Sequence, residues 1–160
     1  MDGFVLALGS NLGERGRTLK EAVVSIGEFC EVKMLSKIYE TPPVGYENQG
    51  DFFNMAISCQ AEISPETLLE KCNETEEKFG RVRSFKNAPR TLDIDIVFFE
   101  NLQIKTPRLE IPHPRWKERD FVITPLLDLL EHGAFDGENF AFVKEILKTK
   151  TRKFNPVKDL

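Results

Sequence analysis

The stretch Phe52-Phe-Asn-Met-Ala-Ile-Ser-Cys-Gln-Ala61 is the clearest structural signal in the chain. Apolar residues occupy every second position from Phe53 to Ala61, and a β-strand points successive side chains to opposite faces of a sheet. The stretch therefore predicts a strand with one fully apolar face. Directly after it, Ser64-Pro65-Glu66 predicts the start of a helix. We expect this helix to end at Gly80, because proline favours the first helical position and glycine the position just past the end.

Further hydrophobic patterns place other elements on either side of this strand and helix. We expect strands over Phe4–Leu8, Val32–Tyr39 and Leu92–Phe99, and a first helix through Leu19, Ala22, Val23 and Ile26. The order strand, helix, strand, strand, helix, strand is typical of an α+β, ferredoxin-like fold with a mostly antiparallel sheet. We expect these two helices to lie on one face of the sheet. Short helices over Pro125–Leu130 and Phe142–Leu147 are expected to cover the rest.

The composition describes one ordinary domain over residues 1–160, with 41% hydrophobic and 30% charged residues. The three cysteines lack C-x-x-C or zinc-ligand spacing, so we expect a reducing, cytoplasmic setting. No apolar run has the pattern of a signal peptide or the length of a membrane span. The net charge of −4 argues against a nucleic-acid partner. We expect small-molecule substrates and a monomeric protein.

A basic segment interrupts this acidic chain. From Arg81 to Arg119, nine Lys or Arg residues stand against five Asp or Glu residues, a net charge of +4. Four of these cations lie within ten residues, namely Arg81, Arg83, Lys86 and Arg90. Arginine side chains bind phosphate in bidentate fashion, so the segment is a candidate anion site. A solvated basic loop is the alternative interpretation.

The tripeptide Asp93-Ile94-Asp95 lies inside a predicted strand, where aspartate is depleted. Both carboxylates point to one face, with Cα atoms roughly 6.5 Å apart, while Leu92, Ile94, Ile96 and Phe98 are expected on the other. Two like charges on one face repel, and hard cations would remove that repulsion. Mg²⁺ is usually held by one or two carboxylates plus substrate phosphates, which favours a metal site over two solvated acids.

Three more residues are candidates for ligand contact. Glu76 lies on the apolar stripe of the second predicted helix, near its end, and is either solvated there or a hydrogen-bond acceptor for a ligand. Phe52 and Asn54 share one strand face, and an aromatic ring beside an amide suits a flat heterocycle with donors and acceptors on its edge. Packing of Phe52 against a helix is the alternative.

Seven motifs together resemble the 6-hydroxymethyl-7,8-dihydropterin pyrophosphokinase family, an enzyme family of folate biosynthesis. They follow the family's order: Leu8-Gly-Ser-Asn-Leu-Gly13, Tyr39-Glu-Thr-Pro-Pro-Val-Gly45, Asp51-Phe-Phe-Asn54, Gly80-Arg-Val-Arg83, Pro89-Arg-Thr-Leu-Asp-Ile-Asp-Ile96, Ile111-Pro-His-Pro114 and Arg119-Asp-Phe-Val-Ile-Thr-Pro-Leu126. The resemblance implies an enzyme that moves the terminal diphosphate of ATP onto the hydroxymethyl group of the pterin and releases AMP.

The resemblance also implies roles for individual residues. Asp93 and Asp95 would hold two Mg²⁺ ions along the triphosphate of the co-substrate ATP, and Arg81 and Arg90 would neutralise phosphate charge during transfer. The positions that match ATP-binding residues of the family are Glu76, Arg83, Arg108, His113 and Arg119. Phe52 and Phe121 would sandwich the pterin, and the residues along its edge would be Thr41, Pro42, Val44 and Asn54.

The chain departs from the commoner family pattern at Asn87-Ala88, where many members have Trp-Gly, and it places a tryptophan at Trp116.

Two other classes of protein share the predicted topology. An RNA-binding module would need a motif of exposed sheet aromatics that is absent here. A ligand-sensing regulatory domain would not need Asp93 and Asp95 on one strand face.

Overall fold

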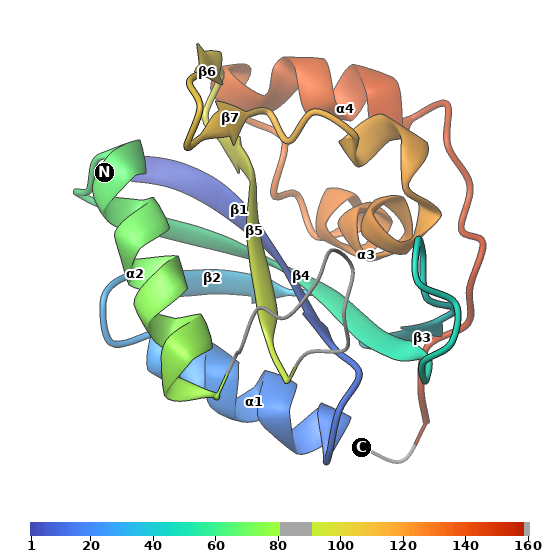
Figure 1. Ribbon diagram of the computed structural model, residues 1–160. Helices are drawn as coiled ribbons and strands as arrows, with labels where there is room; N and C mark the ends of the chain where they lie inside the picture. The colour runs from blue at the N-terminus through green and yellow to red at the C-terminus, as the bar shows by residue number, and fades with distance from the viewer. Residues whose placement is uncertain (81–90, 159–160) are drawn as a thin grey trace.

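The central sheet has the strand order β2–β4–β1–β5, and β3 pairs with β4 beyond the end of β2. The structure is a computed structural model that describes residues 1–80 and 91–158 (Figure 1). The strands are β1 Asp2–Ser10, β2 Glu31–Leu35, β3 Tyr39–Thr41, β4 Phe52–Ala61, β5 Asp93–Phe99, β6 Ile104–Lys105 and β7 Glu110–Ile111. The helices are α1 Arg15–Ile26, α2 Pro65–Lys78, α3 Asp120–Glu131 and α4 Ala141–Leu147, with short 3₁₀ helices over Trp116–Glu118 and Glu138–Phe140.

The topology confirms the predicted α+β, ferredoxin-like class. Strand β1 pairs antiparallel with both β4 and β5, and β4 pairs antiparallel with β2. Strands β1 and β2 therefore run parallel with β4 inserted between them, which is the split βαβ arrangement. A small antiparallel pair of β6 and β7 lies apart from the main sheet.

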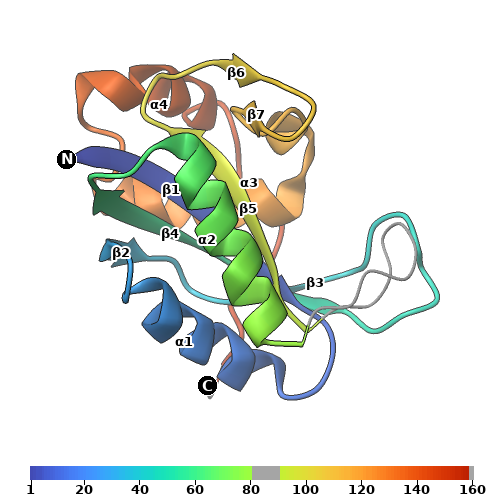
Figure 2. The same ribbon diagram turned by 60° about the vertical axis from the view of Figure 1, so that its left-hand side comes forward.

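Helices cover both faces of the sheet, which confirms that the first two predicted helices share one face and that the later short helices cover the rest. Helices α1 and α2 pack on one face, where the apolar side of β4 faces them, and α3 and α4 pack on the other (Figures 1 and 2). The first core contains Phe53, Met55, Ile57, Cys59 and Ala61 of β4. The second contains Val5, Ala56, Phe98, Trp116 and Leu126. Alternation within single strands thus supplies two separate cores.

Helix α2 begins and ends where the sequence predicts. The Ser64 hydroxyl accepts a hydrogen bond from the backbone N–H of Thr67 at 3.1 Å, and Pro65 occupies the first helical position. Gly80 follows the helix with φ of +80°, a left-handed conformation that favours glycine. These local signals fix the end of α2, from which the chain continues to β5.

The predicted strand over Val32–Tyr39 is two strands, β2 and β3, separated by three residues. The Ser36 hydroxyl accepts a hydrogen bond from the backbone N–H of Ala56 at 2.8 Å, while Ser36 N–H donates to the Ala56 carbonyl at 2.9 Å. A side-chain oxygen thus replaces a backbone carbonyl in the ladder, which interrupts the strand pairing at this point.

Strand β5 contains a β-bulge that reverses the predicted direction of Phe98. In the pairing with β1, Leu6 lies opposite Ile96, whereas Val5 lies opposite Phe98, so Val97 is one extra residue. Val97 and Phe98 consequently both belong to the α3/α4 core, and Phe99 to the α1/α2 core. The prediction that Phe98 shares a face with Ile94 and Ile96 was wrong because strict alternation stops at the bulge.

Helix α3 begins at Asp120, five residues before the predicted start at Pro125. Proline is most favourable in the first helical turn, but here it lies inside the helix, where it cannot donate to the carbonyl of Phe121. The additional first turn contains Phe121, which the prediction placed outside the helix. Over residues 1–80 and 91–158, no helix is long and apolar enough to cross a membrane.

Candidate active site

A pocket opens where β5 begins, beside β3, β4 and the first turn of α3. Its lining residues are Gly9, Thr41, Pro42, Val44, Phe52, Asn54, Asp93, Asp95, Arg119 and Phe121. All six residues predicted to contact the pterin line this pocket, together with the two predicted metal ligands and one predicted ATP-binding residue. Pro42 and Val44 come from the connection between β3 and β4, which extends beyond the sheet (Figure 2). Residues more than 80 positions apart in the sequence therefore share one cavity.

The polar floor of the pocket is formed by Asn54 and Thr41. Both are almost fully buried, with 8% and 2% of their surface exposed. The Asn54 side-chain amide donates to the Thr41 hydroxyl at 2.5 Å across the β3–β4 pair. This hydrogen bond fixes the orientation of the amide, so its carbonyl and the threonine hydroxyl present a defined donor and acceptor pattern to a ligand.

Gly9 is a pocket residue that the sequence interpretation missed, because the predicted strand ended at Leu8. Gly9 belongs to β1, where it lies opposite Asn54 on one side and Asp93 on the other. A Cβ atom at this position would lie 2.9 Å from Asn54 Oδ1 and 3.5 Å from the Phe52 ring. Glycine therefore allows the amide and the ring to approach β1. The close juxtaposition depends on strand register, which the local sequence does not encode.

Two aromatic rings enter the pocket from different elements. Phe52 comes from β4 and has 8% of its surface exposed, while the half-buried Phe121 comes from the first turn of α3. The guanidinium of Arg119 lies 5.5 Å from the centre of the Phe121 ring. Such a contact holds an arginine beside an aromatic surface. The arrangement provides a flat apolar surface next to a cation, and the pterin sandwich stays a prediction.

Asp93 and Asp95 line the pocket from β5, where each is half-buried. Their neighbours across the β1–β5 pair are Gly9 and Ala7, which are small and leave room above the strand. In the described part of the chain, no group of three or more His, Cys, Asp or Glu side chains is placed to hold a metal ion. Mg²⁺ is commonly held by one or two carboxylates and completes its coordination with phosphate oxygens and water, so Asp93 and Asp95 fit this ion.

Glu76 is neither solvated nor part of the pocket lining. Only 4% of its surface is exposed, and its carboxylate accepts a hydrogen bond at 2.8 Å from the backbone N–H of Ile94. The expectation that this acid could be solvated at the helix end was wrong, because α2 packs against β5 and buries it. This hydrogen bond attaches α2 to β5 at Ile94, between Asp93 and Asp95. The contact thus supports the backbone that presents both carboxylates.

His113 lies outside this pocket and lines a separate cavity with Trp116 and Lys117. Burial and the neighbouring Arg119 lower the pKa of His113 to about 4, so the imidazole is neutral at pH 7. Its Nδ1 accepts a hydrogen bond from Arg115 N–H at 3.2 Å, which leaves the proton on Nε2. His113 can therefore donate one hydrogen bond, which is what a phosphate oxygen would accept.

The remaining predicted residues do not join one cluster in the described structure. Arg108 lines a third cavity with Glu66 and Leu69, on the side of α2. Among the predicted ATP-binding residues within 1–80 and 91–158, Arg119 alone reaches the pocket that contains Asp93 and Asp95. The predictions for Arg81, Arg83 and Arg90, like the question of Asn87-Ala88, lie outside the described residues.

The fold and the pocket together define a ferredoxin-like α+β protein with a small-molecule site at one end of its sheet. The model of the 7,8-dihydro-6-hydroxymethylpterin-pyrophosphokinase (HPPK) family matches residues 5–131. The chain therefore belongs to the HPPK family. The 2-amino-4-hydroxy-6-hydroxymethyldihydropteridine pyrophosphokinase of Bacillus subtilis is 42% identical over 128 residues, 79% of this chain and 77% of the relative. The protein of the same name from Aquifex aeolicus is 39% identical over 124 residues, 78% of each chain.

Solved structures show the same fold at low sequence identity. The crystal structure of wild-type Plasmodium falciparum HPPK-DHPS with SDX-DHP has a TM-score of 0.59 and 16% identity, covering 81% of this chain and 40% of that longer one. A second HPPK-DHPS structure, described as in complex with substrates, has a TM-score of 0.61 and 18% identity. It covers 93% of this chain and 44% of the other. These similarities support the fold assignment.

Proposed function

We propose that this protein transfers the terminal diphosphate of ATP to the hydroxymethyl group of 6-hydroxymethyl-7,8-dihydropterin and releases AMP. The observation that carries the proposal is the single pocket that combines an aromatic and amide-lined half with two carboxylates of β5. The family membership and the names of the relatives support the same reaction. The domain that performs it spans residues 1–160 and acts as a monomer.

The aromatic half of the pocket binds the pterin. Phe52 and Phe121 contact the two faces of the flat heterocycle, and a stacked aromatic pair contributes about 0.5–1.5 kcal/mol beyond the buried area. Asn54 and Thr41 pair with polar atoms on the heterocycle edge, while Pro42 and Val44 close the rim. The buried Asn54–Thr41 hydrogen bond keeps these groups in place before the ligand arrives, which reduces the entropy lost on binding.

Asp93 and Asp95 would hold two Mg²⁺ ions together with the phosphates of ATP. When bound, such ions neutralise phosphate charge and lower the pKa of a coordinated hydroxyl. The donor set fits, because two half-buried carboxylates share one strand face and the pocket. Glu76 acts through the backbone, since its hydrogen bond to Ile94 N–H holds the strand between the two ligands.

The arginines bring positive charge to ATP, and the neutral His113 brings a hydrogen-bond donor. We assign Arg81 and Arg90 to the diphosphate during transfer and Arg83, Arg108, His113 and Arg119 to ATP binding, with Glu76 beneath the strand that carries the metal ligands. Arg119 lines the pocket beside the ring of Phe121, and His113, in its separate cavity, supplies an N–H donor while remaining neutral. Fixed cations and donors around the phosphates stabilise the charge of the transition state more than that of the ground state.

The reaction needs one bond to form and one to break. The pterin hydroxyl oxygen attacks the β-phosphorus of ATP, and the bond from that phosphorus to the oxygen shared with the α-phosphate breaks. AMP leaves with that oxygen, and the hydroxyl proton passes to solvent water. Closure of the pocket around the acceptor limits competition from water.

The RNA-binding alternative is less consistent with the structure. An RNA-recognition module stacks bases on aromatic residues of an open sheet face. Helices α1 and α2 cover one face of this sheet, and α3 and α4 cover the other (Figure 1). The pocket residues are also clustered at one end of the sheet and do not extend along a strand surface.

The decisive experiment is incubation with Mg-ATP and 6-hydroxymethyl-7,8-dihydropterin, followed by identification of both products. Formation of AMP and a pterin diphosphate in equal amounts supports the proposal. Formation of ADP would show an ordinary kinase, and absence of pterin-dependent ATP consumption would refute diphosphate transfer. Chelation of divalent cations should stop AMP formation, and added Mg²⁺ should restore it.

A further inference from the structure

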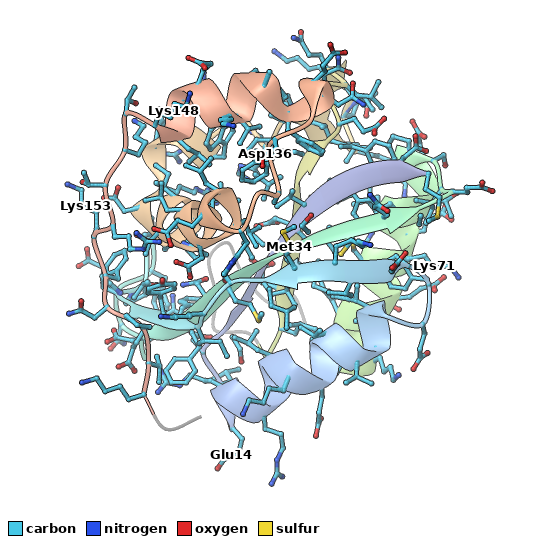
Figure 3. The ribbon with its side chains drawn as sticks, turned by 180° about the vertical axis from the view of Figure 1, so that it is seen from behind. Glu14, Met34, Lys71, Asp136, Lys148 and Lys153 are labelled. Carbon is cyan, nitrogen blue, oxygen red and sulfur yellow. The ribbon has the colours of Figure 1, made fainter. Side chains whose placement is uncertain are left out.

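We propose that the C-terminal tail, residues 148–158, sets the spacing of the pterin pocket through Asp128, so that Arg152 and Tyr39 are positioning residues for the acceptor substrate. This inference rests on the proposed function. The tail lies outside residues 5–131, the part matched by the family model. It leaves α4 and passes along α3 to β3 (Figures 1 and 3, where Lys153 marks it).

The centre of this arrangement is the carboxylate of Asp128 on α3, which is 5% exposed. The Tyr39 hydroxyl of β3 donates to it at 2.7 Å, and the backbone N–H of Lys37 donates at 3.0 Å. Arg152 of the tail donates through Nη2 at 2.9 Å and through Nε at 3.3 Å. Three segments from distant parts of the chain therefore meet at one buried acid.

Further contacts attach the tail to α3 and to the residues around Tyr39. The backbone N–H of Lys153 donates to the Thr124 hydroxyl of α3 at 3.1 Å. Beyond it, Val157 N–H donates to the Ile38 carbonyl at 2.7 Å, and Pro156 forms a β-bridge with Tyr39. Arg152 also pairs with Glu131 at 2.7 Å. The tail thus holds α3 on one side and β3 on the other.

The two attached elements are two walls of the pocket. On β3, Tyr39 and Thr41 are two residues apart and both buried, so they point to the same face. On α3, Phe121 lies two helical turns before Asp128 and thus on nearly the same side of the helix. The attachment at Tyr39–Asp128 therefore fixes the distance between the wall that carries Thr41 and the wall that carries Phe121.

Removal of the tail contact should loosen this spacing and leave the carboxylates of β5 unchanged. Loss of one partner of a buried charge is costly, since the remaining Asp128 carboxylate must find another donor. A shift of α3 relative to β3 would move Phe121 away from the heterocycle. In the proposed function, the ATP phosphates lie beside Asp93 and Asp95 of β5, whereas the hydrogen bonds described above attach residues 152–157 to α3 and to Ile38–Tyr39. The expected effect is selective for the pterin.

The test compares steady-state kinetics of Arg152→Gln, Arg152→Lys and Tyr39→Phe with the wild type and with Lys148→Gln. Lys148 is a tail cation that pairs only with the exposed Glu145 at 3.5 Å among the ion pairs described, so it controls for the charge change. We expect the KM for the pterin to rise at least about fivefold in Arg152→Gln and Tyr39→Phe, with the KM for ATP within about twofold. Arg152→Lys should recover part of the loss, because lysine keeps the charge but lacks the fork.

Folding is checked by circular dichroism and melting temperature, and Tyr39→Phe keeps the ring if Arg152→Gln proves unstable. A pterin KM within about twofold of wild type in folded variants, or equal rises in both KM values, would overturn the proposal. Absence of AMP formation by the wild type would instead remove the proposed function. Normal wild-type turnover together with unchanged KM values in the variants would overturn only the proposed role of the tail.

Discussion

The two halves of the pocket are built in opposite ways. On the β3–β4 side, Asn54 and Thr41 are almost fully buried and hydrogen-bond to each other. On the β5 side, Asp93 and Asp95 are half-buried acids on one strand face beside the small residues Gly9 and Ala7. One half presents neutral polar groups that hydrogen-bond to each other, and the other presents two carboxylates on one strand face.

This difference indicates separate tasks for the two halves. A floor fixed before binding discriminates between ligands by shape and hydrogen-bond pattern, because a wrong ligand leaves buried groups unpaired. Two carboxylates on one strand face are stabilised most when cations and phosphates bind beside them. Recognition of the acceptor should therefore be separable from catalysis by mutation, and the following predictions test that separation.

The largest effect is expected on the carboxylate side. Asp95→Asn keeps the shape of the side chain and removes the charge, so kcat should fall by a factor of about 1,000 or more, equivalent to roughly 4 kcal/mol of barrier. Pterin affinity, measured by calorimetry, should stay within about twofold. Asp136→Asn, at an exposed carboxylate paired with Lys144, is the control. Turnover within about tenfold of wild type at saturating Mg²⁺ would contradict the metal role.

The next effect is expected at the aromatic residues. Phe121→Ala should weaken pterin binding by more than about tenfold while ATP affinity barely changes, because stacking and buried area are both lost. Titration calorimetry with a non-hydrolysable ATP analogue present measures this. The control is Phe29→Ala, which removes a partly buried ring next to the α1/α2 core. This variant should be less stable but should bind the pterin and ATP as the wild type does. If Phe121 is merely a core residue, its variant will melt earlier and bind the pterin normally.

A smaller effect is expected from Gly9→Ala. The new Cβ would lie 2.9 Å from Asn54 Oδ1, so the amide must move and its hydrogen bond to Thr41 weakens. We expect pterin affinity to fall about fivefold to tenfold, in line with about 1–1.4 kcal/mol for a disturbed buried hydrogen bond. Gly137→Ala is the matched control, since no atom lies within 4 Å of its Cβ. Equal pterin dissociation constants for the two variants would show that the floor tolerates displacement.

The smallest effect concerns alkaline pH. Burial and the hydrogen bond to Asp128 raise the pKa of Tyr39 to about 12 from its ordinary value of 10.0. A raised pKa means that the folded protein binds this proton more tightly than the unfolded chain. The contribution to stability is therefore complete below pH 10 and is lost as the pH rises towards 12.

Two measurements check that the pKa of Tyr39 is raised in the folded protein. In a Tyr46→Phe background, ultraviolet absorbance of tyrosinate reports Tyr39 alone and should rise only near pH 12. Chemical denaturation should show that Tyr39→Phe loses less stability than wild type between pH 10 and 12. An ordinary titration near pH 10 would mean that the contact with Asp128 is absent in solution.

The sequence predicted those parts of the fold that depend on local signals. Alternation in β4, the Ser64 cap of α2 and the glycine after it all lie within a few residues of the element they determine. Of the pocket residues, Phe52, Asn54 and the two aspartates were candidates from their strand positions, the motif resemblance added the others except Gly9, and the structure brings them together. Their chemical roles stay predictions.

The errors occurred where a distant segment decides the local structure. Ser36 breaks a strand because of its contacts to Ala56, and Glu76 is buried because Ile94 N–H meets it. Neither partner can be identified from the neighbouring sequence. The attachment of Arg152 to Asp128 was not predicted for the same reason, since the two residues are 24 positions apart and only the packing of the tail on α3 joins them.

The bulge in β5 determines where this strand can gain or lose a residue during evolution. Val97 is the extra residue, so a chain without it would still direct Asp95 towards the pocket side, Phe98 to the same side and Phe99 to the opposite one. Loss of Ile96 instead would leave Val97 to fill the α1/α2 face, or would shift the pairing and turn both carboxylates into an apolar core. The bulge is thus a point at which the length of β5 can change while Asp93 and Asp95 keep their pairing with β1.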